Sequence, residues 1–267
     1  KSFDIVLIDT TPPPVPGIPT TTSPTRNQTP PWTWNPRHDM NEEGEEPAGY
    51  NVYLDDELIA NVSTNAFSED DYETYQVDPL AEGTHHLQVT ALDALGNESD
   101  VSATGHVVID LTAPAAPAAP IPDVNPTNQG SQLWQWDYVE GAARFDVQTA
   151  EDGEDWSEPI NVGNALTFTT GFAGDRITGY LRVRAIDALG NVGEWSTAGS
   201  VYVDTVAPSA PTGLTLDPEG LLIGEVLYTA DGTPKVTWDG PEDAAHYDVW
   251  LDGKYWIGTE NAEYEFT

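Results

Sequence analysis

A short sequence that occurs twice constrains the fold of this chain more than any other feature. Residues 91–97 read Ala-Leu-Asp-Ala-Leu-Gly-Asn, and residues 185–191 read Ala-Ile-Asp-Ala-Leu-Gly-Asn. Alternating apolar and polar runs flank the two copies, at residues 86–90 and 107–110 and at residues 180–184 and 201–204. Such alternation indicates strands with one buried face, and Gly-Asn tolerates the positive φ of a tight turn between strands. The repeat predicts an array of small β domains.

The spacing of tryptophan supports the same period. Trp34, Trp136 and Trp238 follow one another at intervals of 102 residues, and Phe145 and Tyr247 are separated by the same interval. Units of about 100 residues with short strands and frequent turns are typical of β-sandwiches. We therefore expect an all-β fold in which each core is built on the repeated Trp. The expected partners are Tyr50, Val52 and Val89 for Trp34, then Phe145, Val147 and Val183 for Trp136, and Tyr247 and Val249 for Trp238.

Three Asp residues mark the candidate domain junctions. Asp9, Asp110 and Asp204 each end an alternating run, and a Pro-containing segment that makes a stiff extended connector follows each of them. The predicted organisation is residues 1–9 as the last strand of a preceding domain, followed by sandwich domains at residues 10–110, 111–204 and 205–267. We expect the third domain to lack its last two strands, so that the sequence is the interior of a longer polypeptide.

Two explanations of the incomplete ends stay open. The first is a truncated piece of a longer chain. The second is strand exchange between copies in a filament, in which residues 3–8 of one copy add to the incomplete sandwich of another. Open sheet edges favour such exchange because they recruit further strands.

The charge of the chain excludes one class of partner. The chain has 9 basic and 45 acidic residues and a net charge of −36. Nucleic acid is excluded because its binding depends on Lys and Arg that neutralise phosphate, and an anionic membrane surface is disfavoured for the same reason. The charge fits high salt, abundant divalent cations or simply a soluble acidic surface. The chain has no Cys, which excludes disulfides and leaves bacterial surface proteins open, and it has no apolar run of the ~18 residues that a membrane helix needs.

These residues carry a family resemblance. Residues 238–249, which read Trp-Asp-Gly-Pro-Glu-Asp-Ala-Ala-His-Tyr-Asp-Val, resemble the fibronectin type III pattern, and residues 136–147 follow it in part. The Asp-to-Pro junctions and the Asp-Ala-Leu-Gly-Asn turns resemble those of bacterial immunoglobulin-like repeats in surface adhesins and secreted polysaccharide-degrading enzymes. The resemblance implies a tandem array of immunoglobulin-like or fibronectin III-like sandwiches, extracellular or on the cell surface. The long acidic loop at residues 37–49 departs from the pattern.

The sequence contains no recognisable catalytic motif. It has no Cys, and none of its five His stands in a Gly-x-Ser-x-Gly elbow or a His-Glu-x-x-His motif. We therefore expect no enzyme but a structural spacer of a bacterial surface or secreted adhesin-like protein, whose partners are its own neighbouring domains. The alternatives are glycan-binding accessory domains of a polysaccharide-active enzyme and the filament subunit that exchanges strands with other copies.

Calcium is the predicted cofactor, bound where a domain meets its incoming linker. The expected ligands are Asp9, Asp93 and Asn97 at the first entrance and Asp110, Asp187 and Asn191 at the second, while Asp204 would face the turn that the third domain lacks. Calcium takes about six to eight oxygens from carboxylates, amides and carbonyls. An ion at each entrance would offset carboxylate repulsion and lock adjacent domains in line. The alternative is that each Asp accepts hydrogen bonds from backbone N–H groups in its own turn.

Four tryptophans lie outside the repeated core position, namely Trp156, Trp195, Trp250 and Trp256. If alternate residues of the strand at 247–251 point inward, Trp250 points outward, where exposed aromatic surface often marks a binding site. Trp250 and Trp256 are therefore the candidates for glycan contact. The alternative is that these two rings cover each other across the hairpin between them.

Overall fold

The computed structural model describes residues 9–36, 47–63, 72–217, 221–223, 226–228, 232–251 and 253–266. Within these ranges every helix or strand assigned is a β-strand, which confirms the predicted all-β fold. The chain divides into two compact units, residues 1–123, 133–170 and 179–200 in one and residues 124–132, 171–178 and 201–267 in the other. Residues 1–8, predicted as most of a closing strand, and residues 37–46 of the acidic loop lie outside the described residues.

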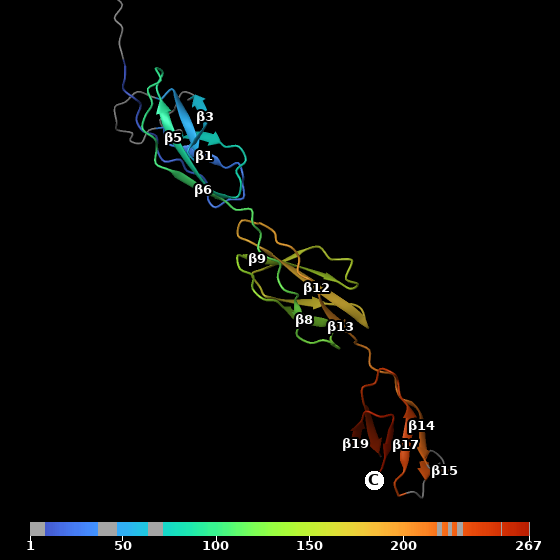
Figure 1. Cartoon of the computed structure of the whole chain (residues 1–267). Helices are drawn as coiled ribbons and strands as arrows, with labels where there is room; N and C mark the ends of the chain where they lie inside the picture. Colours follow the sequence, from blue (N-terminus) through green and yellow to red (C-terminus); the bar gives the residue numbers. More distant parts are fainter. Residues whose placement is uncertain are drawn as a thin grey trace, which may run out of the picture. The chain divides into compact units, whose positions relative to one another are not determined.

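The first repeat, at residues 9–110, contains two antiparallel sheets (Figure 1), a four-stranded sheet of order β3-β2-β5-β6 and the pair β1-β4. The strands are β1 (Pro31–Trp34), β2 (Gly49–Leu54), β3 (Glu57–Ser63), β4 (Glu73–Gln76), β5 (Gly83–Leu92) and β6 (Gly105–Ile109). Asp55 and Asp56 turn β2 into β3 with φ angles of 49° and 69°, a left-handed conformation that Asp tolerates better than most residues. Buried and exposed residues alternate along β6, so one face of this strand covers the core.

The second repeat, at residues 111–204, has sheets of order β11-β8-β7 and β10-β9-β12-β13. Its strands are β7 (Ile121–Pro122), β8 (Ser131–Gln135), β9 (Arg144–Ala150), β10 (Ile160–Gly163), β11 (Thr167–Gly171), β12 (Ile177–Ile186) and β13 (Gly199–Val203). The chain passes from β10 to β11 in the other sheet and returns to β12 beside β9. This crossing between two sheets is the arrangement of immunoglobulin-like and fibronectin-like sandwiches.

The third repeat, at residues 205–266, contains a sheet of order β14-β17-β20 and the pairs β15-β16 and β18-β19. Its strands are β14 (Thr212–Asp217), β15 (Leu221–Ile223), β16 (Val226–Tyr228), β17 (Lys235–Asp239), β18 (Tyr247–Leu251), β19 (Lys254–Thr259) and β20 (Glu263–Glu265). Each sheet of the three repeats is built from strands of one repeat alone. The strand pairings therefore follow the period that the sequence shows.

The repeated Trp has the predicted place in the first core. Trp32 and Trp34 lie on one face of β1 and are 0% and 1% exposed. The Trp34 ring meets Tyr50 edge to face with 5.5 Å between centroids, and Val52 and Val89 belong to the same buried cluster. This packing confirms the strand register expected from alternation.

The other two repeated tryptophans pack in the same way. Trp136 is buried and meets Phe145 with 6.0 Å between ring centroids. Trp238 meets Tyr247 at 5.3 Å. The interval of 102 residues therefore corresponds to the same ring pairing in all three repeats. Trp34 and Trp136 are buried as predicted, whereas Trp238 is only half-buried, so the core expected on Trp238 is not found among the described residues.

Candidate functional site

The repeated turn after β5 is built around the buried carboxylate of Asp93. Its Oδ1 accepts hydrogen bonds from the backbone N–H groups of Leu95 and Asn97, both at 2.8 Å, and its Oδ2 accepts one from Asn97 Nδ2 at 2.6 Å. Gly96 has a φ of 90°, which a side chain would disfavour. Asp, Gly and Asn are therefore needed together, as the acceptor, the left-handed residue and the returning donor.

The turn after β12 repeats this geometry. Asp187 Oδ1 accepts the N–H groups of Gly190 at 2.7 Å and Asn191 at 2.8 Å, and Oδ2 accepts Asn191 Nδ2 at 2.8 Å. Gly190 has a φ of 91°. Asp187 and Asn191 are both buried. The shared Asp-Ala-Leu-Gly-Asn sequence therefore forms closely similar turns, which differ in that the second backbone donor to the Asp is Leu95 in the first turn and Gly190 in the second.

Each turn is tied to the linker that enters its own repeat. Asn97 Nδ2 donates a hydrogen bond to the backbone carbonyl oxygen of Asp9 at 3.3 Å. Asn191 Nδ2 donates the corresponding bond to the carbonyl oxygen of Asp110 at 3.1 Å. The structure thus brings together the residues grouped at each entrance, through an Asn amide and a backbone carbonyl. We call each of these two contacts an entrance latch.

An arginine that sequence reasoning missed adds to the second entrance. Arg26 donates a hydrogen bond from NH1 to the backbone carbonyl oxygen of Gly190 at 2.8 Å. Arg26 belongs to the first repeat and Gly190 to the turn of the second. No sequence motif surrounds Arg26. The chain has only 9 basic residues, so the presence of an arginine at this position was the one signal that the sequence offered.

The carboxylates of the linker Asp residues accept hydrogen bonds from backbone N–H groups two residues further along the chain. Oδ1 of Asp9 accepts the N–H of Thr11 at 2.9 Å, and Oδ1 of Asp110 accepts the N–H of Thr112 at 3.1 Å. The third linker Asp, Asp204, does the same for a residue two positions on, at 3.2 Å. These are Asx turns, which stiffen the start of each linker.

The hydrogen bonds of the turns also set the acidity of their carboxyl groups. Burial alone would raise the pKa of Asp93, but hydrogen bonds from the side chain and backbone of Asn97 outweigh it, so the pKa lies below its usual value. The pKa of Asp187 is lowered against burial by the matching bonds from Asn191. Both groups are therefore held as carboxylates, which accept hydrogen bonds but do not donate them.

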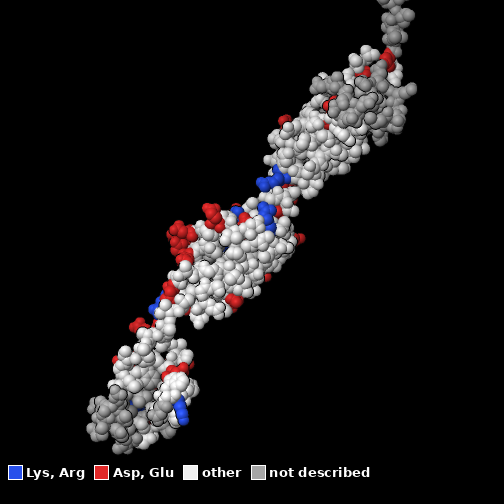
Figure 2. All heavy atoms as spheres, turned by 180° about the vertical axis from the view of Figure 1, so that it is seen from behind, with Lys and Arg blue, Asp and Glu red and all other residues white. Residues whose placement is uncertain are grey.

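Acidic side chains outnumber basic ones on the described surface. Figure 2 shows Asp and Glu gathered along one edge of the second repeat and in scattered spots elsewhere on a mostly uncharged face, with few Lys and Arg. The described residues nevertheless contain no group of three or more His, Cys, Asp or Glu side chains placed to hold one metal ion. Calcium at the entrances stays a prediction.

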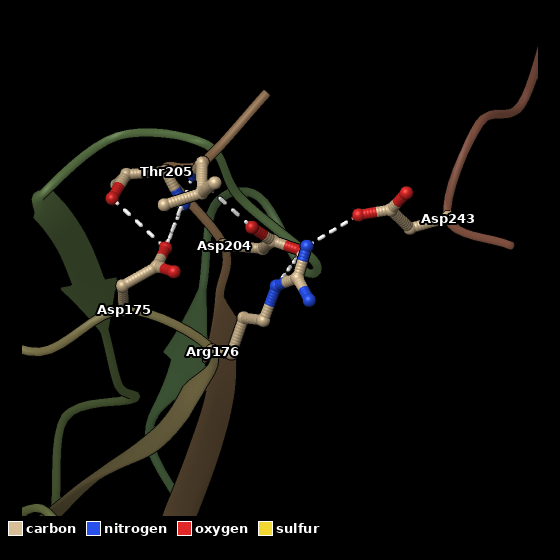
Figure 3. A network of polar contacts seen from close by, with 6 residues as sticks. Asp175, Arg176, Asp204, Thr205 and Asp243 are labelled. Atoms are coloured by element: carbon tan, nitrogen blue, oxygen red, sulfur yellow. Dashed lines mark hydrogen bonds and ion pairs between the residues drawn. The ribbon is translucent and has the colours of Figure 1, made fainter. Parts of the chain in front are cut away.

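Asp204 is held by an arginine of its own repeat (Figure 3). Arg176 Nε lies 3.6 Å from Asp204 Oδ2, and its NH2 also pairs with Asp243. Asp175 Oδ1 accepts two hydrogen bonds from Thr205, one from the backbone N–H at 2.6 Å and one from the side-chain hydroxyl Oγ1 at 3.0 Å. The charge of Asp204, followed by the hydrogen bond with Asp243 and the charge of Asp243, raises the pKa of the Arg176 guanidinium. We expected Asp204 to face the turn that the third domain lacks, but its carboxylate faces Arg176.

The two candidate glycan contacts do not cover each other. Trp250 is 59% exposed and pairs across the hairpin with Tyr255, at 5.8 Å between ring centroids, because a register shift follows Val249. Trp256 meets Phe266 at 6.1 Å. The alternative in which the two Trp rings cover each other is therefore wrong. The physical reason is the shift in register, which places Tyr255 opposite Trp250.

A largely apolar pocket of about 750 Å³ adjoins Trp250. Its lining includes residues from β17 and from β18, namely Val236, Trp238, Tyr247, Val249 and Trp250. Trp238 and Tyr247, which form the ring pair of this repeat, are thus also part of the pocket wall. Sequence reasoning placed these residues in the core and did not anticipate the pocket.

The other two tryptophans outside the core form a stack with arginine. The Arg182 guanidinium carbon lies 4.1 Å from the Trp156 ring centroid and 4.9 Å from that of Trp195. Arg184 lies 4.5 Å from the Trp195 centroid. Guanidinium groups so placed are attracted to the ring faces. Arg182 therefore takes up ring faces that could otherwise stack on a sugar.

Among the residues that the structure describes, no helix is long and apolar enough to span a membrane.

Comparisons with known proteins give matches among solved structures. No family model matches the chain, and no curated protein matches it. Among solved structures, the FN1-FN3 domains of chicken CNTN1 match with 15% identity and a TM-score of 0.36, over 96% of this chain and 88% of that one. The FN3tt structure matches with 17% identity and a TM-score of 0.31, over 36% of this chain and 99% of that one.

Proposed function

We propose that this chain is a non-catalytic spacer of a long extracellular or cell-surface, adhesin-like protein. The observation that carries the proposal is the entrance latch, which occurs twice with the same residue types. The side-chain amide of Asn97 donates a hydrogen bond to the backbone carbonyl of Asp9, and that of Asn191 donates one to the backbone carbonyl of Asp110. Evenly repeated sandwiches with a fixed linker entrance would hold a binding domain at a distance from the surface.

Other features support a spacing role. The linkers combine Pro with an Asx turn at Asp9, Asp110 and Asp204, and both limit backbone freedom. A net charge of −36 favours solubility and opposes association of the chain with itself. The length of such a region matters more to its function than any single surface residue.

Small-angle scattering of the full chain tests the stiffness of the linkers. The double variant Asn97→Ala, Asn191→Ala should give a broader distribution of interatomic distances than the wild type, because both latches are lost. The exposed Asn164→Ala provides a matched control. An unchanged distribution in the double variant would remove the latch as the stiffening element.

Calcium at the same entrances extends this proposal. To bind an ion, Asn97 would present its amide oxygen in place of Nδ2, and Asp93 would exchange N–H partners for the cation. The same holds for Asn191 and Asp187. A bound ion would neutralise part of the charge and stiffen the junction further.

A role as a glycan-binding accessory region is the second candidate. It is favoured by the exposed Trp250 beside an apolar pocket of about 750 Å³. A polysaccharide pull-down separates the two candidates. A spacer should show no specific retention, whereas retention abolished by Trp250→Ala and kept by Trp156→Ala would establish the accessory role.

A further inference from the structure

Two histidines face each other across neighbouring strands of the first repeat. His86 on β5 and His106 on β6 are register partners. Their rings are perpendicular, with 4.7 Å between centroids, and the two Nδ1 atoms lie 2.6 Å apart. Both side chains are exposed, while the next residues along each strand, Leu87 and Val107, are fully buried.

A hydrogen bond between the two rings accounts for this short distance. Two neutral imidazoles can approach so closely only if one Nδ1–H donates to the lone pair of the other Nδ1. Both ring nitrogens are therefore directed at a common point. A metal ion at that point would replace the proton, since imidazole binds metals through the same lone pair.

Little movement is needed to admit an ion. Zinc–nitrogen bonds are about 2.0–2.1 Å long, so two imidazoles on a tetrahedral ion have nitrogens roughly 3.3 Å apart. Rotation of exposed rings about their side-chain bonds opens the pair from 2.6 Å to that separation. The strand pairing fixes the positions of both Cα atoms throughout.

The third histidine of this region is already engaged. His85 Nδ1 lies 2.7 Å from Asp55 Oδ2, and its Nε2 lies 3.0 Å from the carbonyl oxygen of Ala81. His85 thus points away from a shared ion. The site consists of two protein nitrogens, and water would complete the coordination.

We propose that His86 and His106 form a binding site for a divalent first-row transition ion such as Zn²⁺, Ni²⁺ or Cu²⁺. Imidazole ligands suit these ions, whereas Ca²⁺ and Mg²⁺ prefer oxygen. The acidic chain raises the local concentration of cations. Because β6 lies at the edge of its sheet, a bound ion links that edge strand to β5. The site is independent of the spacer role and of calcium at the entrances.

Copper titration of the full chain tests the proposal. Calorimetry should show one site that His86→Gln or His106→Gln weakens at least about tenfold, because two imidazoles chelate the ion where one does not. Electron paramagnetic resonance of the wild type should show hyperfine coupling from two nitrogens. The control is His246→Gln, which removes an exposed histidine of the third repeat and should leave affinity unchanged.

Zinc supplies a readout that does not depend on copper chemistry. Excess Zn²⁺ should raise the unfolding midpoint of the wild type and leave that of both histidine variants unmoved, while Ca²⁺ should have no effect that distinguishes the variants. Circular dichroism without metal should show that both variants keep the fold. Equal copper affinity in wild type and both variants, or one nitrogen alone in the resonance spectrum, would overturn the proposal.

Discussion

The side-chain amide of Asn191 donates a hydrogen bond to the backbone carbonyl oxygen of Asp110 at 3.1 Å. The same nitrogen donates to Asp187 Oδ2 at 2.8 Å. One amide therefore joins the turn after β12 to the linker that enters the repeat. The corresponding amide of Asn97 donates hydrogen bonds to Asp93 Oδ2 and to the backbone carbonyl oxygen of Asp9.

Asn191→Ala should destabilise the second repeat by about 1–3 kcal/mol, because a buried carboxylate oxygen loses its donor. The linker at residues 111–120 should also become more sensitive to proteolysis, since its carbonyl contact is lost. Urea unfolding and limited proteolysis measure the two effects. Asn164→Ala is exposed and should change neither. Equal cleavage rates in both variants would contradict the latch.

Asp187 should make stability depend on pH in acid. Its pKa is lower in the folded state than in the unfolded state, so the unfolded chain binds more protons and stability falls as pH falls. The contribution is complete above the unfolded value of about 3.9 and is lost as pH drops through the lower folded value. Urea unfolding of Asp187→Asn between neutral and acid pH should show a shallower loss than the wild type.

The comparison with the wild type is essential here, because protonation of the many other carboxylates relieves repulsion and acts in the opposite direction. Asp137→Asn, at an exposed position, controls for the loss of one charge. If the Asp137 and Asp187 variants have the same dependence on pH, the turn bonds do not lower the pKa.

Trp136→Ala should destabilise the second repeat by about 3–5 kcal/mol, because a buried ring that packs on Phe145 leaves a cavity. Urea unfolding followed by circular dichroism measures the change. Trp250→Ala should cost within about 0.5 kcal/mol, because that ring is 59% exposed. A small effect at Trp136 would show that the repeated Trp does not organise the core.

Arg182→Ala should cost about 1–2 kcal/mol through the loss of its stacking on Trp156 and Trp195. Arg182→Lys keeps the charge but not the planar group, so it should restore little of the loss. Near-ultraviolet circular dichroism reports the tryptophan environment, and Arg144→Ala serves as the control. Full recovery by Lys would mean that charge alone matters.

If calcium binds at the entrances, it should narrow the range of conformations that the full chain adopts. Small-angle scattering with calcium and with a chelator measures this range, and calorimetry measures the binding heat. The prediction includes loss of that heat in the double variant Asp93→Asn, Asp187→Asn. An unchanged maximum dimension, together with no heat, would leave hydrogen bonds alone to hold the entrances.

The sequence by itself determined the all-β class, the repeat and the buried cores of the first two repeats. Alternation reports which face of a strand is buried, and burial is a local property of the pattern. The interval between Trp34, Trp136 and Trp238 was therefore sufficient to place two buried cores and, in the third repeat, the pairing of Trp238 with Tyr247. The Gly-Asn turns could likewise be predicted, because a turn depends on backbone geometry within about five residues, and acceptance of backbone N–H groups by Asp93 and Asp187 was the stated alternative to calcium.

Only the tertiary structure decided which side chains meet across strands and linkers. The register shift beside Val249 pairs Trp250 with Tyr255, and the pairing of β5 with β6 places His86 against His106. Contacts of this kind depend on bulges, loop lengths and the approach of distant segments, which no local period encodes.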